Sequence, residues 1–469
     1  MTMQTKINTR FSGITQQEID AARHCLEFSK AQGVSQARVS VNKSTMDSVQ
    51  LFNGQVDKVS HNADRSIYIY LFIDGKYGTY STNRFGTDEL EEFILKAIER
   101  TKMLAPDKDR ELPDPARYAK GAVTGRELGL YDESYEEISS QDRMDRALSG
   151  SIYSCAAAGT EGWRLISEEC EYSDSIDDNY LADTLGFEGR HTETSFSYWS
   201  EMTIEDSKGV KYSGYWWSSS PSADRMEIAG CSEKALEKAV AQIGPGKHRG
   251  GKFTMVVDNT SSSRLAAPLI NALYASAIQQ KGSFLMDSLG KKIFPEELTV
   301  RDMAQSYGMA GSRLFDSEGV ATPEQDIISR GKVEMYFVPT YLSNKMGIPG
   351  TVDGPSRPVI LPFLKGETKN LDCQEFEINL QAILRKAGDG ILVTGFNGGN
   401  CNRTTGCFSY GIEGFAFRNG EITHPVKEMI ITGDMISLWK SIIAAGDDAR
   451  YGTRWQIPTL AFENVDFSA

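Results

Sequence analysis

Thiols, amides and a guanidinium group occur together in one glycine-rich stretch, "FNGGNCNRTTGCFSYGIEGF" (396–415). Cys401 and Cys407 could serve as nucleophiles or metal ligands, because a thiolate does both kinds of chemistry. However, five residues separate them, whereas structural zinc sites use cysteine pairs with about two residues between them. "CFSYG" (407–411) also lacks the first glycine of a nucleophile elbow. The spacing favours structural thiols beside a hairpin and leaves a hydrolase that uses either cysteine as an alternative.

Other candidate motifs are incomplete. "GKHRGGKF" (246–253) places Phe253 where a P-loop has Ser or Thr, and it precedes an expected strand instead of following one. The chain has five histidines, and no two have the spacing of one helical turn that helical zinc motifs use. The acidic "EECEYSDSIDDNY" (168–180) lacks the spacing and glycine of a calcium loop, so we expect a strand edge with hydrated charges. "YWW" (215–217) predicts a sheet packed on a core.

Composition narrows the class of protein. With 469 residues, 40% of them hydrophobic, the chain is expected to form two or three globular domains. Its net charge of −14 argues against broad contact with nucleic acid. The N-terminus has no apolar signal region, and the longest apolar run, "IYIYLFI" (67–73), is too short to span a bilayer. We therefore expect a cytoplasmic protein whose seven cysteines are reduced, buried thiols, and which binds neither membrane nor nucleic acid.

The order of expected elements predicts an α+β fold. Asn53-Gly54 and Asp74-Gly75 each lie between alternating segments, which predicts two hairpins. Helices are expected at 15–33, at 87–104 with Thr87 as N-cap, and late in the chain at 434–446. The expected domains are an N-terminal helix and antiparallel-sheet domain (1–112), a central α+β domain (113–246) and a C-terminal β-rich domain with a few helices (247–469).

Three long stretches together resemble one protein family. They are 47–83, beginning "DSVQLFNGQVDKVS", 333–354, "VEMYFVPTYLSNKMGIPGTVDG", and 388–435, beginning "GDGILVTGFNGGNCNRTTGCFSYGIEGF". This pattern resembles the TldD/PmbA (TldE) proteins, historically called modulators of DNA gyrase, and it extends from about residue 15 to the end. The resemblance implies that 396–415 is sheet and turn, in which glycines allow close backbone approach.

The family has two branches, which differ in a metal-binding helix. TldD-like members carry H-E-x-x-x-H and a late cysteine, which hold a zinc ion for peptide hydrolysis. The corresponding segment here is "LAAPLINALYAS" (265–276), with Ala266 and Ala267 in place of His-Glu and Asn271 in place of the second histidine. "DDARYGTRWQIP" (447–458) also lacks the late cysteine. The chain therefore resembles the PmbA/TldE branch, which implies that it binds no metal and that zinc lies in a TldD-like partner.

The resemblance implies a non-catalytic subunit of a cytosolic TldD/TldE-type metallopeptidase complex. Such a heterodimer would bind unfolded peptides or leader peptides, and the chain would be inactive alone and could form a homodimer in isolation. We assign no catalytic residue, and motif position places Asn271, Asn344, Asn400 and Arg403 at a peptide cleft or subunit interface. Two alternatives stay open: a binding protein that acts directly on gyrase or DNA, and an independent hydrolase that uses cysteine or an assembled metal site.

Overall fold

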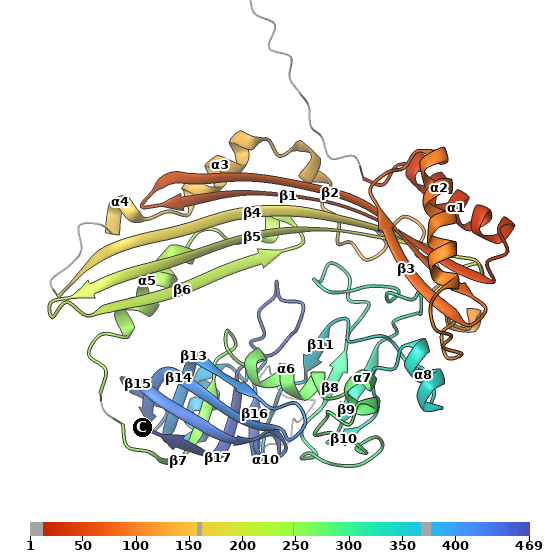
Figure 1. The fold of residues 1–469 in the computed structure, drawn as a ribbon. Helices are drawn as coiled ribbons and strands as arrows, with labels where there is room; N and C mark the ends of the chain where they lie inside the picture. The colour runs from red at the N-terminus through yellow and green to blue at the C-terminus, as the bar shows by residue number, and fades with distance from the viewer. Residues whose placement is uncertain (1–12, 157–161, 247, 367–376) are drawn as a thin grey trace, which may run out of the picture.

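An arched sheet stands over a C-terminal body in this computed structural model (Figure 1), which describes residues 13–156, 162–246, 248–366 and 377–469. The mixture of helices and mostly antiparallel strands confirms the predicted α+β class. Within the described ranges, no helix is both long enough and apolar enough to cross a membrane.

The arch is one six-stranded antiparallel sheet with the order β3-β2-β1-β4-β5-β6. Its strands are β1 (Gln36–Phe52), β2 (Gln55–Ile73), β3 (Lys76–Thr82), β4 (Trp163–Asp183), β5 (Glu188–Asp206) and β6 (Lys211–Ser220). Both predicted hairpins are confirmed, and in the first turn Asn53 and Gly54 have φ of 52° and 72°, the left-handed values that such a tight turn needs. β1 pairs with β4 from Arg38 to Phe52, so strands from the first two expected domains share one sheet.

Helices cover the two halves of the arch. They are α1 (Gln16–Ala31), α2 (Thr87–Lys102), α3 (Ser140–Ser149), α4 (Tyr153–Ala156) and α5 (Cys231–Ala241). The predicted helix near 15–33 is confirmed, and a capping box between Thr15 and Glu18 starts it. The prediction of Thr87 as an N-cap is wrong, because Gly86 occupies the cap and Thr87 is already helical.

Several acidic side chains of β4 are buried, contrary to the prediction of hydrated charges. Asp174 and Asp178 are 1% and 2% exposed. The guanidinium group of Arg143 donates to both carboxylate oxygens of Asp174 at 2.8 Å, and Arg190 Nε donates to Asp178 at 2.9 Å. The prediction failed because β4 is a central strand, and arginines that are distant in the sequence pair with its inward carboxylates.

The C-terminal body contains two further sheets. A seven-stranded sheet has the order β12-β16-β17-β15-β14-β13-β7, and a four-stranded sheet has the order β10-β9-β8-β11. Strands of the larger sheet are β7 (Gly251–Val257), β12 (Phe363–Leu364), β13 (Gly390–Cys401), β14 (Cys407–Arg418), β15 (Glu421–Asp434), β16 (Ile442–Ala445) and β17 (Leu460–Ser468). Those of the smaller sheet are β8 (Val300–Asp302), β9 (Gln325–Ser329), β10 (Lys332–Val333) and β11 (Pro358–Ile360).

Five helices accompany these sheets: α6 (Ser263–Asn271), α7 (Ala275–Gln279), α8 (Thr340–Met346), α9 (Leu380–Ala387) and α10 (Met435–Lys440). The predicted late helix is too long, because it ends at Lys440 and the following β16 pairs with β17 in the buried sheet. Apolar side chains of α6, including Leu265 and Leu269, join the main core under β13 and β14.

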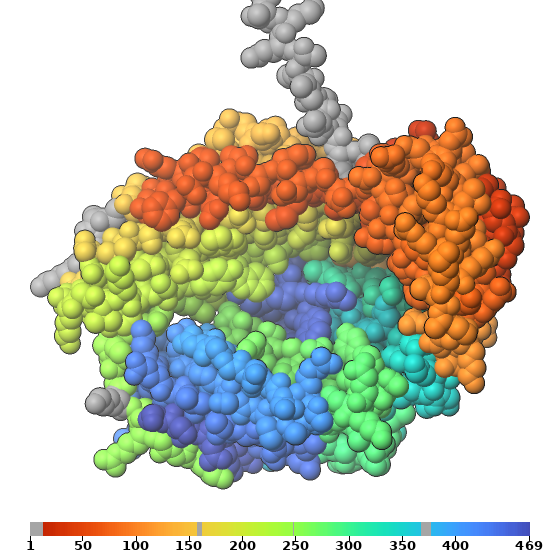
Figure 2. Space-filling model, in the orientation of Figure 1, coloured from red at the N-terminus to blue at the C-terminus, as the bar shows by residue number. Residues whose placement is uncertain are grey.

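The arch contacts the C-terminal body at its β3 end and near its middle. Near β3, Tyr341 of α8 donates a hydrogen bond to the Asp107 carboxylate at 2.8 Å. Near β6, Ser219 Oγ donates to the carbonyl oxygen of Gly452 at 2.9 Å, and Arg450 donates to the carbonyl oxygen of Trp217. Figure 2 shows a hollow between the arch and the C-terminal body.

Candidate functional site

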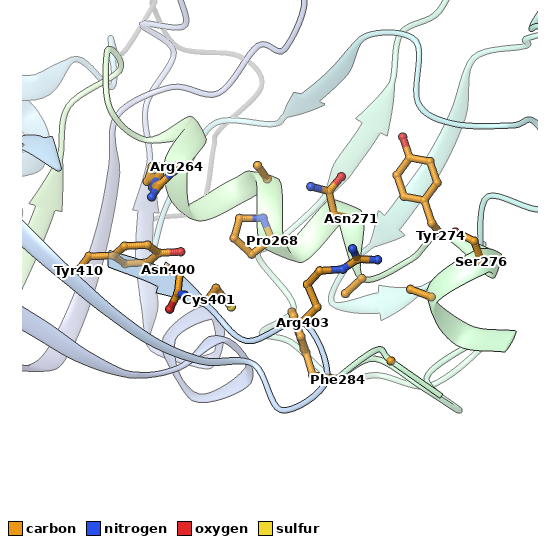
Figure 3. A pocket seen from close by; sticks show the side chains of 14 residues that line it. Arg264, Pro268, Asn271, Tyr274, Ser276, Phe284, Asn400, Cys401, Arg403 and Tyr410 are labelled. Carbon is orange, nitrogen blue, oxygen red and sulfur yellow. The ribbon is translucent and has the colours of Figure 1, made fainter. Parts of the chain in front are cut away.

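A cavity of about 510 Å³ lies between α6 and the β13–β14 hairpin (Figure 3). Its volume is in the range of small-molecule and peptide side-chain sites. The walls combine apolar, amide, aromatic and guanidinium groups. The lining residues are Arg264, Ala267, Pro268, Asn271, Ala272, Tyr274, Ser276, Ala277, Gly282, Phe284, Asn400, Cys401, Arg403 and Tyr410.

One face of α6 forms the upper wall of this cavity in Figure 3. Arg264, Ala267, Pro268 and Asn271 line it, and their spacing of three, four and seven residues places them on one side of a helix. The opposite side carries Leu265, Ala266, Leu269 and Ile270, which are at most 1% exposed and belong to the core.

The helical register places the three candidate metal-ligand positions differently. Ala267 and Asn271 line the cavity, whereas Ala266 faces the core. With the register shifted by one residue, Ala267, Pro268 and Ala272 occupy the same spacing, and all three line the cavity. In either register, these positions offer methyl, pyrrolidine and amide groups, none of which is a common zinc ligand.

The β13–β14 hairpin forms the facing wall and fixes the position of Arg403. Asn402 Oδ1 accepts hydrogen bonds from the amides of Thr404 and Thr405 at 3.0 and 3.1 Å. The amide of Phe284 donates to the Arg403 carbonyl at 3.1 Å. From this anchored loop, the Arg403 side chain extends toward Asn271 on α6 (Figure 3).

The glycines of this hairpin allow close contact between its strands. A Cβ on Gly399 would lie 2.0 Å from the Ser409 carbonyl oxygen, and Gly399 has a φ of 79°, so this position needs glycine. Sheet and turn at 396–415, as the resemblance implied, are therefore present as β13, its turn and β14.

The charged groups at the cavity wall are both cationic. Arg264 donates to the Gly399 carbonyl at 3.0 Å, and its guanidinium carbon lies 5.1 Å from the Tyr410 ring centroid. Arg403 is exposed and brings a second guanidinium group. None of the lining residues, all within the described part of the chain, is Asp or Glu. The cavity therefore carries a local positive charge on a protein whose net charge is −14.

The residues of the cavity do not fit a zinc ion. The remaining donors are amides, hydroxyls and the Cys401 thiol, and burial, followed by the nearby Cys407, raises the pKa of that thiol. Zinc prefers imidazole, thiolate and carboxylate ligands, and two guanidinium groups would repel a cation. Across the ranges that the structure describes, no group of three or more His, Cys, Asp or Glu residues could hold a metal.

The cysteines differ in exposure. Cys25, Cys170 and Cys231 are free and buried, as predicted. Cys155 and Cys407 are exposed, so the prediction that all the thiols are buried is wrong. These two cysteines are exposed because Cys155 lies on the short α4 and Cys407 lies at the start of β14 beside the hairpin turn. Cys373 lies outside the described residues.

Four residues were predicted at a peptide cleft or subunit interface. Three of them line this cavity: Asn271, Asn400 and Arg403. The fourth, Asn344, lies on α8, where its amide donates to the Asp109 carbonyl at 3.1 Å and to Glu111 at 2.8 Å. It therefore connects α8 to the segment that follows α2.

Arg264, Tyr274 and Tyr410 also line the cavity and were not predicted from the sequence. The signal for Arg264 was present, since it lies seven residues before Asn271 and so shares its helical face. No comparable signal existed for the two tyrosines, because the tertiary fold brings them to the cavity.

A second cavity, of about 690 Å³, separates the edge of the arch from the C-terminal sheet. Tyr215 and Trp217 of β6 line it together with Phe415 of β14. Tyr215 is 46% exposed, whereas Trp216 packs against the core beneath α5. The prediction that the aromatic run packs on a core is therefore correct for Trp216 only, because alternate residues of a strand point to opposite faces.

Comparison with known proteins gives a consistent result. Three family models match: PmbA/TldA metallopeptidase domain 1 over 37–101, the central domain over 130–243 and the C-terminal domain over 250–469. Metalloprotease PmbA of Escherichia coli is 25% identical over 452 residues, which cover 92% of this chain and 93% of that protein.

Solved structures agree. A Bacteroides thetaiotaomicron protein described as a modulator of DNA gyrase is 38% identical, with a TM-score of 0.89 over 97% of this chain and 100% of that one. TldE of Thermococcus kodakarensis is 17% identical with a TM-score of 0.78 over 97% of this chain and 100% of that one, which supports the fold alone. The chain belongs to the PmbA/TldD metallopeptidase family.

Proposed function

We propose that this chain is a non-catalytic, TldE/PmbA-like subunit that pairs with a TldD-like metallopeptidase and helps it to bind unfolded peptides. The observation that carries the proposal is the cavity face of α6. The chain belongs to a metallopeptidase family. This face of α6 nevertheless presents alanine, proline and asparagine at the positions where the resemblance places the metal motif of the catalytic branch. The cleavage site would then lie in the partner, and this chain would form part of the peptide-binding surface.

The hollow under the arch supports a role in binding extended chains. Specific contacts at α8 and at the end of β6 hold the C-terminal body to the arch, so the hollow between them is a defined space (Figure 2). The second cavity, between the arch and the C-terminal sheet, is lined by two aromatic side chains of β6, Tyr215 and Trp217. Aromatic rings offer large apolar contact area to side chains of varied sequence, which suits a subunit that handles unfolded peptides.

The test is reconstitution with a zinc-loaded TldD-like protein that carries an intact H-E-x-x-x-H motif. Cleavage of a flexible peptide would be followed for the partner alone, this chain alone and the mixture. We expect no cleavage by this chain alone and a rate in the mixture well above that of the partner alone.

Two controls sharpen this experiment. A partner with Glu of its motif replaced by Gln should abolish cleavage in the mixture, which locates the chemistry in the partner. Size-exclusion chromatography should show a joint species. An unchanged cleavage rate on addition of this chain, or cleavage by this chain alone, would contradict the proposal.

A further inference from the structure

The two guanidinium groups of the cavity on α6 have no carboxylate partner among the residues that line it, unlike several other arginines of the described chain. Arg143, Arg190 and Arg313 each form an ion pair with a carboxylate, at Asp174, Asp178 and Asp353. Arg264 donates to a backbone carbonyl and lies beside a tyrosine ring, and no Asp or Glu lines the cavity that it shares with Arg403.

We propose that this cavity binds a carboxylate group of an extended peptide at Arg403 on the hairpin, with Arg264 on α6 adding positive charge at the other end. The inference rests on the proposed function, because it names the chemical feature of the peptide that this subunit would recognise. Arg403 extends toward Asn271, whereas Arg264 lies at the other end of α6 beside Tyr410 (Figure 3). A single carboxylate would therefore contact Arg403, and Arg264 would add to the positive charge of the cavity.

Guanidinium geometry suits this ligand. Each group presents five N–H donors in a planar fork that matches the two oxygens of a carboxylate. Arg264 uses one of its terminal nitrogens for the Gly399 carbonyl, and its remaining N–H groups can serve a ligand. The side-chain amides of Asn271 and Asn400 line the same cavity and can donate further hydrogen bonds.

The rest of the wall favours a carboxylate that is attached to a peptide over a small inorganic anion. Ala267, Pro268 and Phe284 give apolar surface beside the charged groups, and the cavity volume of about 510 Å³ is far larger than one anion requires. Apolar surface next to cationic groups fits a carboxylate with hydrocarbon attached. Either the C-terminal carboxylate of a peptide or an acidic side chain has this chemistry.

Fluorescence anisotropy with the full chain tests the proposal. Three labelled forms of one flexible peptide would be compared: one with a single carboxylate at its C-terminus, one with that end amidated, and an amidated one with a single internal Glu. We expect a carboxylate form to bind about tenfold or more tightly than the form with none, because charged hydrogen bonds are the stronger class. The carboxylate form that binds more tightly identifies the source.

Variants test whether the cavity is responsible. Arg403→Gln should remove most of the preference for a carboxylate, and Arg264→Gln should weaken it. Arg418→Gln is the matched control, because Arg418 is exposed on the same hairpin but does not line the cavity. Circular dichroism would check that each variant is folded.

Three results would overturn the inference: equal binding of acid and amide forms, a preference that survives both cavity variants, or no binding of any peptide. If the unmodified chain shows no carboxylate preference but still stimulates the partner, this inference alone is refuted. Conversely, a clear preference without any stimulation refutes the proposed function and leaves the carboxylate site standing.

Discussion

Two sets of arginines show how the same side chain serves different ends in this molecule. Between α3 and the arch, Arg143 is largely buried and forms a two-point pair with Asp174, whose side chain is fully buried. At the cavity on α6, Arg264 and Arg403 are exposed and no carboxylate lines the space they share. A charge that has a buried partner stabilises the fold, whereas a charge at a cavity without one is free to bind a ligand.

The largest predicted effect is a difference in the free energy of unfolding between variants of the two sets of arginines. Arg143→Ala leaves Asp174 buried without its partner, which should lower the free energy of unfolding by about 3–5 kcal/mol. Arg403→Ala removes an exposed side chain and should change it by no more than about 0.5 kcal/mol. Urea denaturation followed by circular dichroism measures both values. Similar losses of unfolding free energy in the two variants would contradict the distinction between the two sets of arginines.

The pH dependence of the Arg143→Ala loss has a defined sign. Burial raises the pKa of Asp174 even with Arg143 hydrogen-bonded to it, so the folded state binds this proton more tightly than the unfolded state. Stability linked to a raised carboxyl pKa increases as the pH falls. The destabilisation by Arg143→Ala should therefore be smaller under acidic conditions, where the carboxyl group is neutral.

A smaller effect is predicted at Cys401, which lines the cavity. Burial, followed by Cys407, raises the pKa of the Cys401 thiol, and only the thiolate reacts with iodoacetamide. Its alkylation at mildly alkaline pH should be slower than that of a free thiol compound and should accelerate as the pH rises. A bound carboxylate peptide should slow this reaction several-fold.

Cys155 provides the control, because it is exposed on α4 and does not line the cavity. Peptide mapping by mass spectrometry would follow both sites in one sample. Protection of Cys155, or no protection of Cys401, would show that the peptide binds elsewhere.

The sequence was most informative where local rules decide the structure. Asn53-Gly54 predicts its turn because both residues tolerate positive φ. Local rules failed where distant segments meet: the acids of β4 are buried because Arg143 and Arg190 reach them. The segment after Lys440 also departs from the predicted helix, since Ile442 and its neighbours complete a sheet with β17.

The candidate site shows the same division. The resemblance pointed to α6 and the hairpin, and Asn271, Asn400 and Arg403 line one cavity there. Asn344 lies elsewhere, because nothing in its local sequence indicates that α8 contacts the segment after α2. The cationic character of the cavity also needed the structure, since Arg264 and Arg403 are far apart in sequence.

Zinc content of the purified chain is the most direct test of the claim that its α6 face is not a metal centre. The chain and a TldD-like partner would be equilibrated with zinc, dialysed and measured side by side by mass spectrometry of the metal. We predict far less than one zinc per molecule of this chain and a stoichiometric amount in the partner. One tightly held zinc per chain, lost on Cys401→Ser, would contradict the account.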